Sequence, residues 1–271
     1  MEAFLSFFEN LSSLEKVAWI FICLSISWIL EGAIPLVQLN YEKWKHAGRN
    51  LIFLSTSMLI NVLFGLATVG IFLWTSQNEF GLLYLIHLPV WAELLLSVMV
   101  LDFIAQYMAH FILHRVAWMW KFHMVHHSDT EVDATTGTRH HPGDYIIRET
   151  FALAAIIIMG MPLAFYLVYR ITSIVFTYFS HANIKLPLWL DKFLSLFFIT
   201  PSMHKFHHHF ERPWTDTNFG NIFSFWDRIF GTLVFGDATQ VKYGLDVLSD
   251  DKSSDVLYQF KVPFDKSIKT D

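Results

Sequence analysis

Histidine is the residue type in this chain with the most chemical potential, because it is both abundant and clustered. Of 14 histidines, twelve lie between positions 110 and 209. Most fall into three boxes with fixed spacing: His110-x-x-x-His114, His123-x-x-His126-His127 and His204-x-x-His207-His208. Residues three or four apart share one face of a helix, so each box can direct its imidazoles to one place. Neutral imidazole binds iron, zinc, copper and nickel, and the spacing therefore predicts a metal site.

The number of histidines predicts two metal ions. A single zinc ion usually takes four ligands, whereas the boxes alone supply eight. Two ions with four or five imidazoles each fit that count. The chain contains neither Glu-x-x-His nor His-Glu-x-x-His, which argues against a carboxylate-rich di-iron bundle and a zinc protease.

The composition places these boxes in a membrane protein. Apolar residues make up 54% of the 271 positions and charged residues 16%, whereas a soluble domain has about 25% charged residues. The net charge of -5, without a basic block, argues against a nucleic-acid partner. The single Cys23 excludes a disulfide framework and a thiolate cluster.

Apolar stretches long enough to cross a bilayer precede and separate the boxes. We expect spans at Val17–Asn40, Leu51–Thr75 and Trp91–His114, with Leu82–Pro89 at the interface. Phe151–Ile184 is too long for one crossing, at about 51 Å as a single helix. Gly160-Met161-Pro162 can break it into a hairpin that returns His181 to the side of the boxes. The predicted fold is an all-α integral membrane protein with about four membrane-inserted helical segments, the last two a hairpin, and a cytoplasmic helical cap carrying the boxes.

The distribution of positive charge predicts which side the boxes face. Lys43, Lys45 and Arg49 lie in the expected first loop and further Lys and Arg follow His114, whereas Ser76–Val90 has neither. By the positive-inside rule the boxes face the cytoplasm and the N-terminus lies outside. Leu186–Met203 is expected at the interface. We treat the chain as one domain with three regions: membrane spans (1–93), the histidine-box catalytic region (94–236) and a polar cytoplasmic tail (237–271).

The boxes and their surroundings resemble the integral-membrane fatty acid hydroxylase and sterol desaturase superfamily over about Leu94 to Gly244. The supporting motifs are Asp102-Phe103, Arg139-x-His141-Pro142, Thr200-Pro201, Asn218-Phe219-Gly220-Asn221 and Trp226–Thr232. The resemblance implies a non-haem di-iron oxygenase that uses O2 and two electrons to hydroxylate or desaturate an unactivated C–H bond of a lipid, such as a sterol, fatty acyl chain or other membrane lipid. The implied cofactors are two Fe ions, which zinc can replace during purification.

The resemblance also implies partners and a location. The chain has no haem-binding domain, cysteine set or G-x-G-x-x-G motif, so we expect a separate ferredoxin or small cytochrome with its reductase. A bacterial inner membrane is favoured over the endoplasmic reticulum. The oligomeric state is left open.

Residue roles follow from the resemblance and from the spacing together. The expected metal ligands are His110, His114, His123, His126, His127, His181, His204, His207 and His208. Further candidates to ligate or support a ligand are His140, His141 and His209. The residues expected to orient the ligands are Asp102, Gln106, Arg139, Asn218 and Asp227, with Asp129 in the same role. No separate catalytic acid or base is assigned, and His46 and His87 are expected to be ordinary interfacial residues.

Two alternatives stay open from the sequence. The boxes could serve a metal-dependent lipid hydrolase or an ether-lipid-cleaving enzyme. They could also serve a membrane metal-binding or transport protein, although few polar residues, such as Glu31, Asn61 and Glu93, continue through the expected spans.

Overall fold

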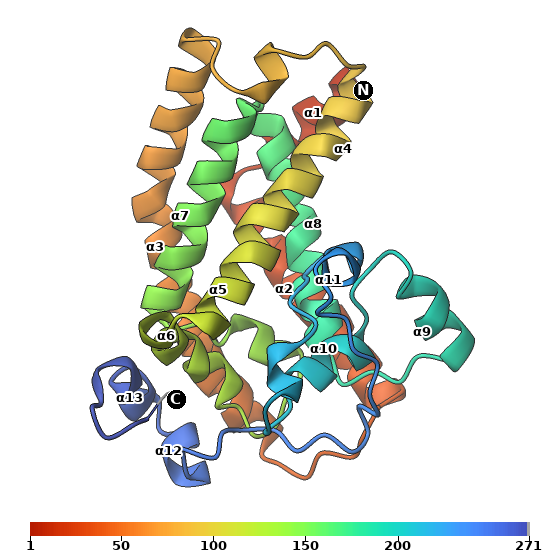
Figure 1. Cartoon of the computed structure of the whole chain (residues 1–271), viewed down its shortest axis with the longest axis vertical. Coiled ribbons are helices and arrows are strands. Elements are labelled where there is room, and N and C mark those ends of the chain that lie inside the picture. The colour runs from red at the N-terminus through yellow and green to blue at the C-terminus, as the bar shows by residue number, and fades with distance from the viewer. Residues whose placement is uncertain (270–271) are drawn as a thin grey trace.

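The computed structural model describes residues 1–269, and that part of the chain is helical without a β-strand, as predicted (Figure 1). Long helices form an elongated bundle, and short helices gather at one end of it. The N-terminus lies at the opposite end of the bundle from α6 (Ala117–His127) and α10 (Pro201–His207), which carry two of the boxes.

Four helical segments are long and apolar enough to cross a membrane, which confirms the predicted class of fold. They are Ser13–Ala33 (α2), Lys43–Tyr84 (α3, Lys43–Gln77, with the 3-10 turn η1, Leu82–Tyr84), Val90–Arg115 (α4, η2 and α5) and Leu163–His181 (α8). A short amphipathic helix, α1 (Glu2–Glu9), precedes them.

Two predicted boundaries of the spans were wrong. The first span ends at Ala33 and not at Asn40, since Pro35 lacks the N–H that a continuing helix needs. The second begins at Lys43 and not at Leu51. Lys43, Lys45 and Arg49 therefore lie on the first two turns of α3 and not in a loop.

The predicted hairpin is present, although its first leg begins earlier than Phe151. It consists of α7 (Pro142–Met159) and α8, joined at Gly160, which has a φ of +62°. A Cβ atom at position 160 would lie 2.1 Å from the backbone oxygen of Phe80, so the turn requires glycine. The hairpin returns His181 to the end of the bundle where the boxes lie.

The third span changes its helical geometry before the first box. Between α4 (Val90–Leu101) and α5 (Ala109–Arg115), residues Asp102–Met108 form a π-helical segment, η2. The i→i+5 hydrogen bonds of this segment make its turn wider than the turns of the flanking α-helices. The apolar core of the bundle packs around this span, α7 and α8, with Leu101, Ile156 and Phe165 fully buried or nearly so.

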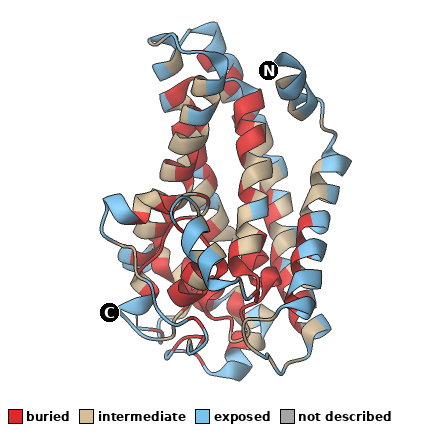
Figure 2. Ribbon diagram, turned by 90° about the vertical axis from the view of Figure 1, so that its right-hand side faces the viewer, coloured by how far each residue is buried: buried red, intermediate tan, exposed pale blue. Residues whose placement is uncertain are grey.

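The rest of the chain forms a cap of short helices in which buried residues concentrate (Figure 2). These helices are α6, η3 (Ala134–Thr138), α9 (Leu188–Leu194), α10, η4 (Trp214–Asp216), α11 (Phe225–Ile229), α12 (Asp250–Ser254), α13 (Val256–Gln259) and η5 (Val262–Phe264). The polar tail is folded onto the second box, because Leu245, Leu248 and Val262 pack with Trp120 and Met124 of α6.

Candidate metal centre

The structure gathers nine buried histidines into two adjacent groups, each able to hold one metal ion. Within a group, the candidate ligand atoms all lie within 4.8 Å of one another. Site A contains His110, His114, His123, His127 and His207, and site B contains His126, His181, His204 and His208. These nine are the histidines that the sequence selected as ligands.

Each five-residue box is divided between the two sites, and helix geometry explains how. His123 and His127, one turn apart on α6, point into site A, whereas His126 points into site B. The third box is divided the other way, since His204 and His208 enter site B while His207 enters site A. The His-x-x-His-His spacing therefore lets the second and third boxes each contribute to both sites.

In site A the imidazoles are oriented for ligation through Nε2. Each Nδ1 lies near an oxygen acceptor: Phe219 O for His110 (2.9 Å), Asp216 Oδ1 for His114 (3.1 Å), Asp144 Oδ2 for His123 (3.2 Å), Thr215 Oγ1 for His127 (3.4 Å) and Thr217 O for His207 (2.6 Å). Each Nε2 is buried without a partner within residues 1–269. Because buried polar atoms are rarely left unpaired, five such nitrogens converging on one point fit a metal ion.

The histidines of site B are spaced as ligands of one metal ion, but fewer of them have a hydrogen-bond partner that orients the ring. The Nδ1 of His181 donates to Thr177 O at 2.7 Å, and its Nε2 lies 2.9 Å from Nε2 of His204 and 3.1 Å from Nε2 of His126. Ligands about 2.1 Å from one ion, at right angles to each other, lie about 3.0 Å apart. By contrast, Nδ1 of His126, His204 and His208 has no hydrogen-bond partner in the described part of the chain.

Burial keeps His123 and His207 neutral, and neutral imidazole is the state that binds metal. Burial lowers the pKa of His123 to about 4 and that of His207 to about 3, although each histidine donates a hydrogen bond that acts in the opposite direction, to Asp144 and to Thr217 O. Ligands of this kind need no deprotonation at neutral pH.

Two aspartates not selected from the sequence orient site A. Asp216 accepts from His114, and Asp144 accepts from His123 at 3.2 Å and from His140 at 2.6 Å. The four-residue spacing of His140 and Asp144 was a usable sequence signal, although only Asp144 lies on α7 and His140 precedes its N-cap residue, His141. Nothing near Asp216 in sequence pointed to His114, which is 102 positions away.

Among the residues expected to support the metal ligands, Asp227 and Asn218 act indirectly, because they hold the backbone of the loop that contacts His110. Asp227 accepts from the N–H groups of Phe219 (2.8 Å) and Gly220 (3.0 Å), and the carbonyl of Phe219 accepts from His110. Burial raises the pKa of Asp227 to about 6. Asn218 bonds Met203 O at 3.0 Å and so ties the same loop to α10.

Arg139, Asp102 and Gln106 support other parts of the structure. The buried Arg139 donates to Val125 O (2.9 Å), Ser128 Oγ (3.0 Å) and Ser253 O (2.5 Å), which joins α6 to the tail. Asp102 accepts from the N–H groups of Ile222 and Phe223 and from Nε1 of Trp226, and it contacts no histidine. Gln106 accepts from Arg148 at 3.3 Å.

The remaining histidines lie outside both sites. His140 stacks on His126 with ring centroids 4.5 Å apart, whereas His141 caps α7 by accepting from Gly143 N, and His209 accepts from Glu211 N. The prediction that His46 is an ordinary interfacial residue was wrong, because it is buried with Nε2 2.8 Å from Asp129. Asp129 thus bonds His46 and not a histidine of either site.

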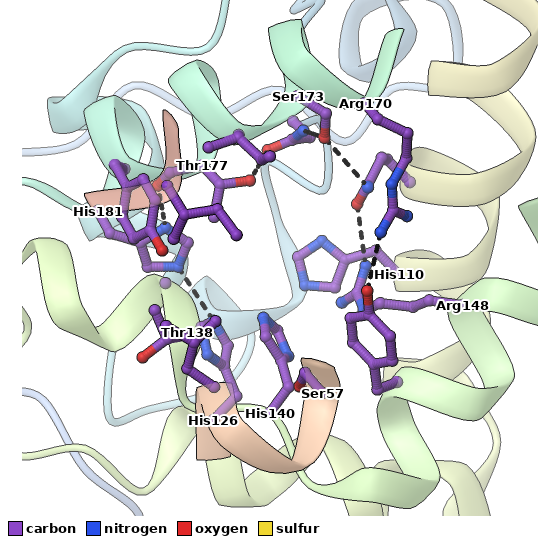
Figure 3. Close-up of a pocket in the computed structure, with 18 of the residues that line it drawn as sticks. Ser57, His110, His126, Thr138, His140, Arg148, Arg170, Ser173, Thr177 and His181 are labelled. Atoms are coloured by element: carbon purple, nitrogen blue, oxygen red, sulfur yellow. Dashed lines mark hydrogen bonds between the residues drawn. The ribbon is translucent and has the colours of Figure 1, made fainter. Parts of the chain in front are cut away.

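A cavity of about 180 Å³ opens onto site B (Figure 3). Three of the four site B histidines line it, together with His110 and His140. From there it follows α8 past Thr177 and Ser173 to Arg170, with α3 and α7 forming further walls. Site B therefore faces a cavity lined by residues of α3, α7 and α8.

The fold and these sites define a helical membrane protein with two adjacent polyhistidine sites. Residues 94–232, just over half of the chain, match the fatty acid hydroxylase family, and the protein belongs to that family. Human alkylglycerol monooxygenase is 28% identical over 88% of this chain and 48% of its own length. Ornithine lipid hydroxylase OlsE of Rhizobium tropici is 26% identical over 53% of this chain and 42% of its own length.

The chain thus spans less than half the length of these two relatives. The alkylglycerol monooxygenase of Xenopus tropicalis is 30% identical over 51% of this chain. No solved structure gives a significant match.

Proposed function

We propose that this protein is a membrane-bound non-haem di-iron oxygenase that hydroxylates an unactivated C–H bond of a lipid. The overall reaction consumes the lipid, O2, two electrons and two protons, and yields the hydroxylated lipid and water. The observation that carries the proposal is the convergence of five unpartnered Nε2 atoms in site A beside the four histidines of site B. Family membership supports the same reaction class.

The chain's own residues would hold, orient and enclose the reacting groups. Site A and site B would each hold one iron ion, and the pair would supply the oxidising power for C–H attack with O2. Asp144, Asp216 and the carbonyls of Thr177, Thr217 and Phe219 fix which nitrogen of each ligand faces the ion. Burial of all nine histidines keeps bulk water from the centre.

The cavity is the proposed place of the lipid, since it connects site B with the space between membrane helices. An ornithine lipid and an alkylglycerol, the compounds in the names of two relatives, are candidate substrates. Electrons would come from a separate ferredoxin or small cytochrome with its reductase, docking on the face proposed to be cytoplasmic. Desaturation is the alternative outcome of the same chemistry.

The test compares lipids from cells expressing the wild type with lipids from cells expressing His207→Ala, both grown under ¹⁸O2. We expect a lipid with one added ¹⁸O atom in the wild type alone. Loss of two hydrogens without labelled oxygen would identify desaturation. Histidine-dependent lipid cleavage with oxygen drawn from water would instead establish the metal-dependent hydrolase.

A further inference from the structure

A buried polar cluster lies in the wall of the cavity, away from both metal sites. Arg170 of α8 donates to Glu149 Oε1 at 2.6 Å, to the hydroxyl of Tyr145 at 2.8 Å and to Asn61 Oδ1 at 3.1 Å. Asn61 also bonds the Tyr145 hydroxyl. Three helices, α3, α7 and α8, thus bring one guanidinium, one carboxylate, one phenol and one amide together.

The cluster lies well inside the bundle. Arg170 is eleven residues before His181 on α8, which corresponds to about 16 Å along the helix axis. Charged side chains within a membrane span are costly and usually serve a function. Figure 3 shows Arg170 and Arg148 on one side of the cavity, with His126 and His181 across from them.

The hydrogen bonds within the cluster leave polar atoms facing the cavity. The Arg170 side chain is 27% exposed, and the Glu149 side chain is 4% exposed. Within residues 1–269 no side chain bonds Nε of Arg170, Oε2 of Glu149 or the hydroxyl of Ser57, which lines the same cavity. A plain hydrocarbon chain in this space would separate these groups from water without giving them a hydrogen-bond partner, which is unfavourable.

The charges of the wall favour an uncharged ligand group. Arg170 is paired with Glu149, and Arg148, the other cation of the wall, is paired with Asp144 at 3.1 Å. A carboxylate or phosphate would add an unbalanced charge and face the carboxylate of Glu149. A hydroxyl group can accept from Arg170 and donate to Glu149 at once.

We infer that the cavity selects lipids carrying an uncharged hydroxyl group, and that Arg170, Glu149, Tyr145 and Asn61 are its specificity-determining residues. The inference deepens the proposed function and rests on it for the identity of the bound molecule as substrate. With the hydroxyl held at this cluster, the carbon presented to site B is remote from it along the molecule.

The test measures displacement of radiolabelled hexadecan-1-ol from the purified, metal-loaded protein in detergent. Competitors are unlabelled hexadecan-1-ol, hexadecane and hexadecanoate. We expect the wild type to prefer the alcohol by about tenfold or more over both others. Tyr145→Phe, which removes one oxygen atom, and the charge-neutral pair Arg170→Met/Glu149→Gln should reduce the preference to within about twofold. Lys45→Met, which removes an exposed cation of α3, should keep it.

The metal content of each variant shows whether that variant has folded. If the double variant does not fold, Tyr145→Phe alone still decides the test. Equal displacement by all three competitors, or a preference unchanged in well-folded Tyr145→Phe and double variants, would overturn the inference. Its failure is separable from that of the proposed function. Labelled-oxygen incorporation without an alcohol preference defeats this inference alone, whereas an alcohol preference without oxidation supports the site and defeats the oxygenase.

Discussion

The Nε2 atoms of His181 and His204 lie 2.9 Å apart, although the residues belong to different helices, α8 and α10. That separation suits two ligands of one ion, and it is also the length of an N–H···N hydrogen bond between the two rings. Because both histidines belong to site B alone, the metal content of the two sites can be tested separately.

We expect about two iron ions per chain in anaerobically purified protein, because the nine histidines divide into two groups. His123→Ala removes a ligand of site A only, and His204→Ala removes a ligand of site B only. Each should lower the content toward one ion per chain, as measured by elemental mass spectrometry. His209→Ala is the matched control, since His209 lies in neither group. One tightly held ion in the wild type would contradict the binuclear assignment.

The two sites should release metal at different rates. All five site A histidines have an acceptor near Nδ1, whereas in site B only His181 does. Loss of such a partner typically weakens metal affinity by about 10- to 100-fold. A chelator should therefore remove the site B ion first, in two resolved phases. The assignment is checked with His204→Ala, which should lack the fast phase and keep the slow one. A single phase in the wild type would show that the difference in orientation has no energetic effect.

Asp216 should affect metal affinity through His114. Asp216→Ala removes the acceptor of Nδ1, and we expect about 10- to 100-fold weaker binding at site A. Asp216→Asn retains an oxygen acceptor and should recover much of the affinity. Asp237→Asn, at an exposed position, is the control. Equal affinity in Asp216→Ala and the wild type would mean that packing alone orients His114.

The sequence was sufficient to predict the class of fold and to select all nine histidines that the structure gathers in sites A and B. It succeeded because apolar length and four-residue spacing are local properties that a helix converts directly into geometry. It failed where the geometry depends on tertiary contacts. Asp102 was expected to orient a metal ligand, but it accepts from the N–H groups of Ile222 and Phe223, 120 and 121 positions later. Asp216 and His46 act across long sequence separations, which no local pattern encodes.

The turn of the hairpin should not tolerate a side chain. Gly160→Ala places a Cβ atom 2.1 Å from Phe80 O in a backbone conformation that L-residues rarely adopt, and we expect a loss of about 1–3 kcal/mol in unfolding free energy. Gly70→Ala is the control, because nothing lies within 4 Å of its Cβ position in α3 and alanine favours a helix. Unfolding monitored by circular dichroism in detergent measures both. A Gly160→Ala protein as stable as Gly70→Ala would show that the turn relaxes freely.

The bonds from Arg139 to Ser253 and from Ser128 to Gln259 connect the second box to residues more than a hundred positions later. On the ribosome, the second box is therefore made long before the segment that anchors it. All nine histidines have been synthesised when His208 is added, yet α6 still lacks its support from Ser253 and Gln259. We therefore expect the metal ligands of α6 to be held in place only after the segment around Gln259 has emerged.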